Sequence, residues 1–211
     1  PRYSMVSPWE LLLYVGLGVA AAFGGLLFMK VLHFFEDRFD AWKFPPYLKP
    51  AVGGLALGIL GYFLPNVLGT GFQSIEDALN GNVAFWLLAI LVFGKILATS
   101  LTLGSGSSGG VFAPALFTGA VLGGAYGQLA NVLFPDITAA SGAYAMVGMA
   151  ALFAGVARAP ITAIIILFEM TQDYRIILPL MFATVLSTVI SRHLEPESIY
   201  TFKLKRRGID V

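Results

Sequence analysis

The sequence predicts an all-α protein that crosses a membrane several times. Of the 211 residues, 57% are hydrophobic and 12% are charged, and the mean hydropathy is +0.81. Soluble domains carry about 25% charged residues, so this composition is typical of a polytopic protein embedded in a lipid bilayer. The apolar residues also fall into consecutive segments separated by proline, glycine or charged breaks.

The first part of the chain contains two long apolar segments. Residues 8–35 are long enough to span a bilayer with tilt, and residues 36–43 are charged and aromatic, as expected at a membrane–water boundary. Pro45 and Pro46 end any helix there. Residues 48–64 form the second segment, which has Gly54 and Gly58 on one face and stops at Pro65.

The middle of the chain contains one short segment and two long ones. Phe72–Leu79 is too short to span, whereas residues 84–103 match the hydrocarbon thickness and carry Lys95 as their only charge. Residues 111–134 carry no charge and place a glycine at every fourth position, which is a face that another helix can approach closely. The glycines are Gly119, Gly123 and Gly127.

The last part of the chain contains segments that are short for a membrane span. These are residues 142–156, 161–170 and 176–190, and breaks at 158–160 and 171–175 separate them. Short, interrupted helices in a membrane usually line a protein-buried site, so the pattern favours a transporter or channel. A basic cluster ends the chain and predicts a cytoplasmic C-terminus by the positive-inside rule. It consists of Lys203, Lys205, Arg206 and Arg207.

The Gly/Ser run over residues 104–110 leads into Val111, Phe112, Ala113 and Pro114. Pro114 suits the first turn of a helix, and the preceding serines and glycines can cap or turn the chain. The first N–H groups of such a helix lack internal partners and carry the positive end of the peptide dipoles, so we expect them to face a small anion. The alternative is a connecting loop followed by a packing residue, Phe112.

Four other residues are candidates for chemistry within the apolar sequence. Tyr200 can donate its phenolic hydroxyl to an anion, or it can be an interfacial tyrosine beside the basic terminus. Lys95, Arg158 and Glu169 are the charges deepest in apolar segments. Arg158 and Glu169 lie beside segment breaks and are expected to be structural. For Lys95, both a structural and a functional role remain open.

An intramembrane serine protease is the alternative function from another class. The residues from Gly106 to Gly109 fit the Gly-x-Ser-Gly pattern of rhomboid-type proteases, with Ser107 and Ser108 inside it. Such an enzyme needs a histidine base near the serine, and His33 and His193 both lie beside polar segment ends.

Composition and residue spacing argue against several other classes of function. The net charge of +1 gives no support for nucleic-acid binding, and the lack of cysteine removes thiol catalysis and cysteine–metal sites. The two histidines are far apart in sequence and no carboxylates cluster at ligand spacing within a span, so no metal site and no cofactor are predicted.

The motifs together resemble the CLC family of chloride channels and chloride/proton antiporters. Residues 109–114, Gly-Gly-Val-Phe-Ala-Pro, are similar to the family's Gly-x-Phe-x-Pro signature. The Arg-Ala-Pro-Ile-Thr at 158–162, the Glu-Met-Thr at 169–171 and the segment 173–179 look like later family motifs in the same order. Ile199-Tyr200 resembles the site of the family's anion-coordinating tyrosine.

This resemblance implies a CLC-type bundle of tilted, partly broken helices that is one half of an inverted repeat. The chain 1–211 would be the C-terminal half of the transmembrane domain, lacking the N-terminal half, its transport glutamates and any CBS domains. The function implied is chloride transport, by a channel or by chloride/proton exchange, and not an enzyme activity. Glu169 has no transport role in this resemblance.

The resemblance also assigns ligands and partners. Val111 and Phe112 would be backbone donors to the chloride ion, Tyr200 a hydroxyl donor, and Gly109, Gly110 and Pro114 the supporting motif. The protein would be a homodimer that meets its partner through residues 161–170 and 176–190, with a separate pore in each subunit.

Overall fold

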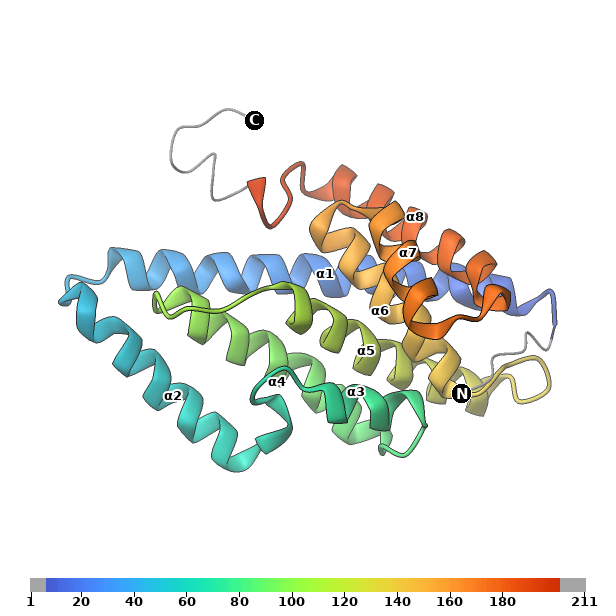
Figure 1. Cartoon of the computed structure of the whole chain (residues 1–211), viewed down its shortest axis with the longest axis horizontal. Coiled ribbons are helices and arrows are strands. Elements are labelled where there is room, and N and C mark those ends of the chain that lie inside the picture. Colours follow the sequence, from blue (N-terminus) through green and yellow to red (C-terminus); the bar gives the residue numbers. More distant parts are fainter. Residues whose placement is uncertain (1–6, 202–211) are drawn as a thin grey trace.

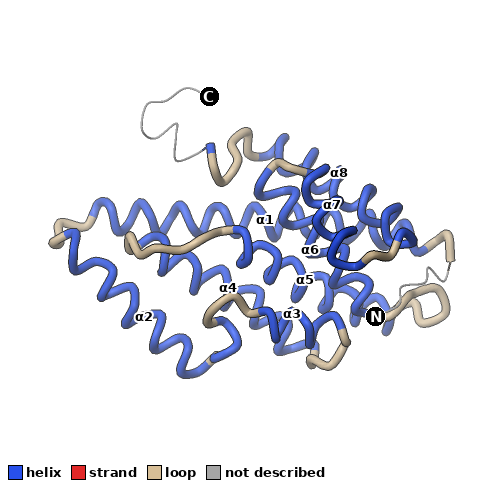
Figure 2. The backbone as a smooth tube through the Cα atoms, in the orientation of Figure 1, coloured by secondary structure: helices blue, strands red, loops and turns tan. Residues whose placement is uncertain are grey.

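The structure is a computed structural model that describes residues 7–201. Over this range the chain folds into α-helices joined by short turns, and it contains no strand (Figures 1 and 2). The helices are α1 (Glu10–Ala41), α2 (Lys49–Phe63), α3 (Phe72–Leu79), α4 (Phe85–Gly104), α5 (Phe112–Leu133), α6 (Ser141–Ala157), α7 (Pro160–Thr171) and α8 (Ile177–Leu194). Three 3-10 turns lie at Pro46–Leu48, Pro65–Val67 and Tyr174–Ile176.

The helices follow the apolar segments of the sequence, and the largest difference is at the end of α1. The helix continues to Ala41 through residues that we expected to form the charged membrane boundary. No proline occurs between position 8 and position 45, so the backbone remains helical. The Arg38 guanidinium lies 5.0 Å from the centre of the Phe34 ring one turn earlier.

Three helical stretches in the described chain are long and apolar enough to cross a bilayer: α1, α4 and Tyr174–Leu194. Helices α6 and α7 are apolar but shorter. The mixture of full-length and short apolar helices is that of an integral membrane protein with several passes.

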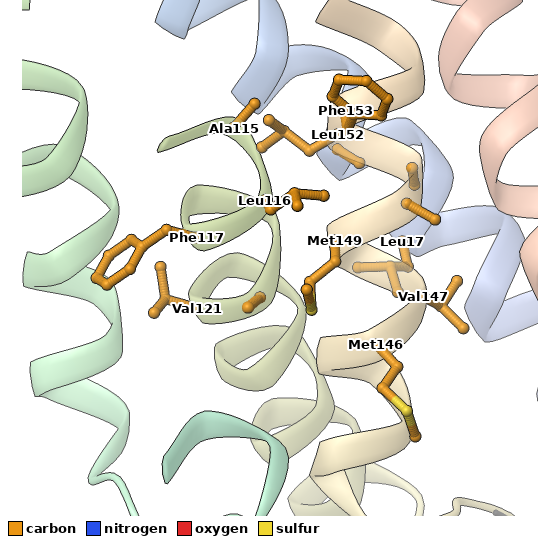
Figure 3. Packing of buried hydrophobic residues seen from close by; sticks show 14 of the residues in the cluster. Leu17, Ala115, Leu116, Phe117, Val121, Met146, Val147, Met149, Leu152 and Phe153 are labelled. Carbon is orange, nitrogen blue, oxygen red and sulfur yellow. The ribbon is translucent and has the colours of Figure 1, made fainter. Parts of the chain in front are cut away.

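Helix α6 is the centre of the fold. Every residue from Ser141 to Val156 is buried, because α5, α1, α8 and α7 surround the helix. Figure 3 shows Met149 and Leu152 of α6 beside Leu116 of α5, while Phe117 points away from α6. An uncharged helix of this length remains stable in the interior because its neighbours replace lipid on all sides.

The glycine face predicted on residues 111–134 is the surface where α5 meets α6. A Cβ atom added at Gly123 would lie 2.2 Å from the Tyr144 carbonyl oxygen, and one added at Gly119 would lie 2.4 Å from the Gly148 carbonyl oxygen. These distances are too short for any side chain, so the two backbones touch directly at this crossing.

Helix α2 lies at the edge of the bundle (Figure 1) and is mostly exposed. Its buried residues are Gly53 and Gly61, which face Ser105 and Leu68 respectively. Nothing in the described chain lies within 4 Å of the Cβ positions of Gly54 and Gly58. The glycine pair noted in the sequence is therefore on an open face of this helix.

Candidate anion site

The start of α5 is formed by the motif that the sequence singled out. Val111 is the N-cap, with φ −99° and ψ −16°, and Phe112 is the first helical residue. Pro114 lies in the first turn, as predicted. Within residues 7–201 no side chain caps this helix start, so the serines before it do not cap α5.

The loop serines instead belong to the end of α4. The Ser105 hydroxyl donates to the Thr102 carbonyl oxygen at 3.0 Å, and the hydroxyls of Ser105 and Ser107 are 3.3 Å apart. These local bonds compete with a cap on the next helix. Within residues 7–201, the positive end of the α5 dipole therefore has no side-chain cap.

A pocket of about 530 Å³ lies in front of this helix start. One wall is the motif itself, a second wall is α4, and a third is the segment before α3. Four residues of the motif identified in the sequence line the pocket: Gly109, Gly110, Phe112 and Pro114. Helix α4 contributes Lys95, Thr99 and Thr102. The third wall contributes Val67, Leu68, Gly69 and Thr70.

Lys95 is the only charged residue lining this pocket, and its side chain is buried, with 1% exposed. Its ammonium group donates to the carbonyl oxygens of Val67 at 2.9 Å and Gly69 at 2.7 Å. It also lies 4.8 Å from the centre of the Phe117 ring of α5. Lys95 therefore ties the third wall of the pocket to α4 and α5, and it brings a positive charge to the pocket.

Thr99 is a pocket residue that the sequence reasoning missed. It lies one helical turn after Lys95, and 6% of its surface is exposed. Its hydroxyl makes no hydrogen bond within residues 7–201, whereas the neighbouring Thr102 hydroxyl donates to the Ala98 carbonyl oxygen at 2.8 Å. The i, i+4 spacing from Lys95 in an apolar helix is the only signal that could have identified it.

The Phe112 side chain packs against α6. Its ring meets the Phe153 ring edge to face, with centroids 5.0 Å apart and an interplanar angle of 78°. About 41% of the Phe112 side chain remains exposed. The ring is thus held on one side by the protein interior and borders the pocket on the other.

Tyr200 lies in the turn after α8, outside the lining of this pocket. The turn is bonded to α6, because the Ile199 N–H donates to the Val156 carbonyl oxygen at 3.3 Å. Half of the tyrosine surface is exposed, and burial of the remainder raises the pKa of its phenol above the ordinary value. The Phe112 ring contacts Phe153, and the residue before Tyr200 bonds to Val156, so the last two turns of α6 contact both segments.

Arg158 and Glu169, the other charged candidates, do not line this pocket. One terminal nitrogen of Arg158 donates to the carbonyl oxygens of Ser191 and Glu197, at 3.2 and 2.9 Å, and to that of Glu195. Glu169 is exposed on α7. The prediction of a structural role for Arg158 agrees with these bonds. The basic residues Lys203, Lys205, Arg206 and Arg207 lie outside the described residues.

The protease alternative gains no support from the geometry. Ser107 bonds to Ser105, and Ser108 has no hydrogen bond to a histidine within the described chain. His193 is exposed near the end of α8. Over the same residues no group of three or more His, Cys, Asp or Glu is arranged to hold a metal ion.

Comparison with known proteins gives one consistent family. Residues 2–192 match the family model described as voltage gated chloride channel. The full chain is 37% identical to a ClcB-like chloride channel protein of Ralstonia nicotianae, of which it covers 49%. It is 35% identical over 98% of its length to the H(+)/Cl(-) exchange transporter ClcA of Vibrio campbellii, of which it covers 45%.

A solved structure has the same arrangement of helices. The crystal structure of a slow cyanobacterial Cl-/H+ antiporter superimposes with a TM-score of 0.88 and 31% identity, over 98% of this chain and 49% of that one. The chain therefore spans about half the length of each of these relatives.

Proposed function

The chain belongs to the voltage-gated chloride channel family, and we propose that it forms the C-terminal half of the transmembrane domain of a chloride transporter. The observation that carries this proposal is the uncapped start of α5 at the pocket, with Val111 and Phe112 as the first backbone donors. The supporting motif, Gly109, Gly110 and Pro114, lines the same pocket.

The proposed site holds the anion by dipoles and hydroxyls. The N–H groups at the start of α5 supply partial positive charge, and the Tyr200 hydroxyl supplies a neutral donor. Conduction requires binding that is strong enough for entry and weak enough for exit, and such donors meet this requirement better than a full ion pair. Lys95 adds charge at the pocket, and its ammonium group donates two hydrogen bonds to carbonyl groups.

The half-length of the chain relative to its relatives supports a second part of the proposal. The other wall of the anion pathway comes from an N-terminal half that is not in these 211 residues. The carboxylates that decide between a channel and chloride/proton exchange belong to that half, and Glu169 is not among them.

By the positive-inside rule, the basic residues after position 202 orient the C-terminus to the cytoplasm.

We also propose a homodimer that forms through residues 161–170 and 176–190. Helices α7 and α8 expose large apolar side chains over these ranges, so lipid or another subunit must cover them. The exposed side chains are Ile161, Ile165, Phe168 and Met170 of α7, and Leu178, Met181, Phe182, Val185 and Val189 of α8.

The experiment that tests the site uses the full-length protein in liposomes. Chloride flux and chloride binding are measured for the double variant Phe112→Ala plus Tyr200→Ala, with Tyr62→Ala as a control because Tyr62 is 84% exposed on α2. We expect both quantities to fall in the double variant and not in the control. Unchanged flux and binding in the double variant would refute the site.

A second measurement tests the half-domain proposal. Residues 1–211 expressed alone should give no chloride flux, because half of the pathway is missing. Flux from this segment at the rate of the full-length protein would contradict the proposal. Ser108→Ala, which removes a serine of the protease alternative, should have no effect on cleavage of any substrate.

A further inference from the structure

We propose that Arg158 is a positioning residue that fixes Tyr200 relative to the start of α5 and thereby sets the anion affinity of the site. This inference rests on the proposed function, since it assumes that Tyr200 is a ligand. It goes beyond a structural role for Arg158, because it predicts that the residue acts through one particular side chain.

The backbone of Arg158 has a conformation that is unusual for a residue with a side chain. The residue is the C-cap of α6 and adopts a left-handed conformation, with φ 60° and ψ 33°. Glycine is the usual residue in this conformation at a helix end, because it has no Cβ atom. Within residues 7–201 the one other non-glycine residue with positive φ is Gln172, the C-cap of α7.

The side chain of Arg158 accounts for the presence of a large residue at this position. Its Nη2 atom is surrounded by three backbone carbonyl groups, those of Ser191, Glu195 and Glu197. These groups belong to the last turn of α8 and to the segment that leads to Tyr200. Carbonyls at a helix end lack internal partners, and a cationic donor stabilises them.

The three hydrogen bonds of Arg158 to backbone carbonyl groups are called the Arg158 clamp below. Helix α6 connects this clamp to the other side of the proposed site. Phe153 packs edge to face on Phe112, and the Val156 carbonyl oxygen accepts a hydrogen bond from the Ile199 N–H. Arg158 follows on the same helix end. The α6 residues 153–158 therefore touch both the start of α5 and the segment that carries Tyr200, so releasing the clamp changes the distance between the two proposed ligands.

The side-chain chemistry predicts which substitutions preserve the clamp. All three hydrogen bonds come from one nitrogen atom, which carries two protons, so two of the carbonyl groups share a proton. A lysine ammonium offers three protons from one nitrogen. Arg158→Lys therefore keeps donors for the carbonyl groups, whereas Arg158→Met keeps an unbranched side chain and loses every donor. Both variants have the same Cβ in the left-handed conformation, so the backbone cost is matched.

The experiment measures chloride affinity of the full-length protein by calorimetry. We expect Arg158→Met to weaken chloride binding about tenfold, the loss expected for one hydrogen bond to an ion, and Arg158→Lys to recover most of it. In a Tyr200→Phe background, Arg158→Met should cause no further loss, because the hydroxyl that it positions is already absent.

Gln172→Met is the matched control, since Gln172 has the same backbone conformation and is exposed on α7. It should leave chloride affinity unchanged. If Arg158→Met does not fold, Arg158→Gln is compared in the same two backgrounds. An equal loss with and without the Tyr200 hydroxyl, or an equal loss in Gln172→Met, would overturn the positioning role. Unchanged affinity in Tyr200→Phe alone would instead overturn the proposed function.

Discussion

The carboxylate of Glu10 accepts a hydrogen bond from the backbone N–H of Ala139 at 2.9 Å, across 129 positions of sequence. The same oxygen atom accepts from the Tyr14 hydroxyl at 3.1 Å, and Glu10 is fully buried. Tyr14 in turn stacks on Tyr144 of α6, with ring centroids 4.7 Å apart. The first turn of α1 thus holds the loop between α5 and α6, and with it one end of the central helix.

We expect Glu10→Leu to destabilise the full-length protein by about 2 kcal/mol, since it leaves the Ala139 N–H and the Tyr14 hydroxyl buried without this acceptor. The free energy of unfolding in detergent, followed by circular dichroism, measures the effect. Glu76→Leu on the exposed side of α3 is the control and should change the stability by less than about 0.5 kcal/mol. Equal effects of the two variants would contradict a specific role for Glu10.

The crossing of α5 and α6 predicts that alanine substitutions at two glycines differ strongly in their effect on stability. Gly123→Ala places a methyl group 2.2 Å from a backbone oxygen atom, so the helices must move apart, at a cost of about 3 kcal/mol. Gly58→Ala on α2 meets no atom within 4 Å and should be neutral or stabilising by up to about 1 kcal/mol. Thermal unfolding of the two variants in detergent tests this, and a stable Gly123→Ala protein would contradict the close crossing.

Replacement of Lys95 should affect both stability and transport. Lys95→Met leaves the Val67 and Gly69 carbonyl groups without a donor and removes the charge that lines the pocket. We expect a loss of about 3 kcal/mol in the free energy of unfolding and slower chloride flux in liposomes. Lys30→Met is the control, because Lys30 is exposed on α1. Normal flux in a folded Lys95→Met protein would show that the residue is structural only.

The contribution of Tyr200 should not depend on pH in the alkaline range. Burial raises the pKa of its phenol above 10.0, so the neutral hydroxyl keeps its proton and continues to donate as the pH rises from about 7 to about 9. The ratio of chloride affinities between the native protein and Tyr200→Phe should be the same at both pH values. A ratio that approaches one at the higher pH would mean that the pKa is lowered rather than raised.

Several features of the site could be predicted because they depend on neighbouring residues in the chain. The apolar segments, their proline breaks and the first-turn position of Pro114 follow from local sequence, and the family motifs follow from the order of the residues. The glycine face was also predictable, since residues at every fourth position of a helix lie on one side. Its partner, α6, was not specified by that spacing.

Whether a serine caps α5 could not be predicted from the sequence, for a physical reason. Serine can bond forward to the next helix or backward to the preceding one, and the sequence favours neither. In the structure Ser105 bonds backward to Thr102. The proposed anion donors therefore lack a side-chain partner, although the sequence pattern was compatible with one.

The sequence by itself determined the membrane class, the order of the helices, the family resemblance and the start of α5, because hydropathy, proline and glycine act over a few residues. Only the tertiary structure decided which groups Glu10, Lys95 and Arg158 bind. Each of these buried polar groups bonds to backbone atoms at least 26 residues away. Backbone N–H and C=O groups are the same at nearly every residue, so the sequence carries no mark of which one a distant side chain will reach.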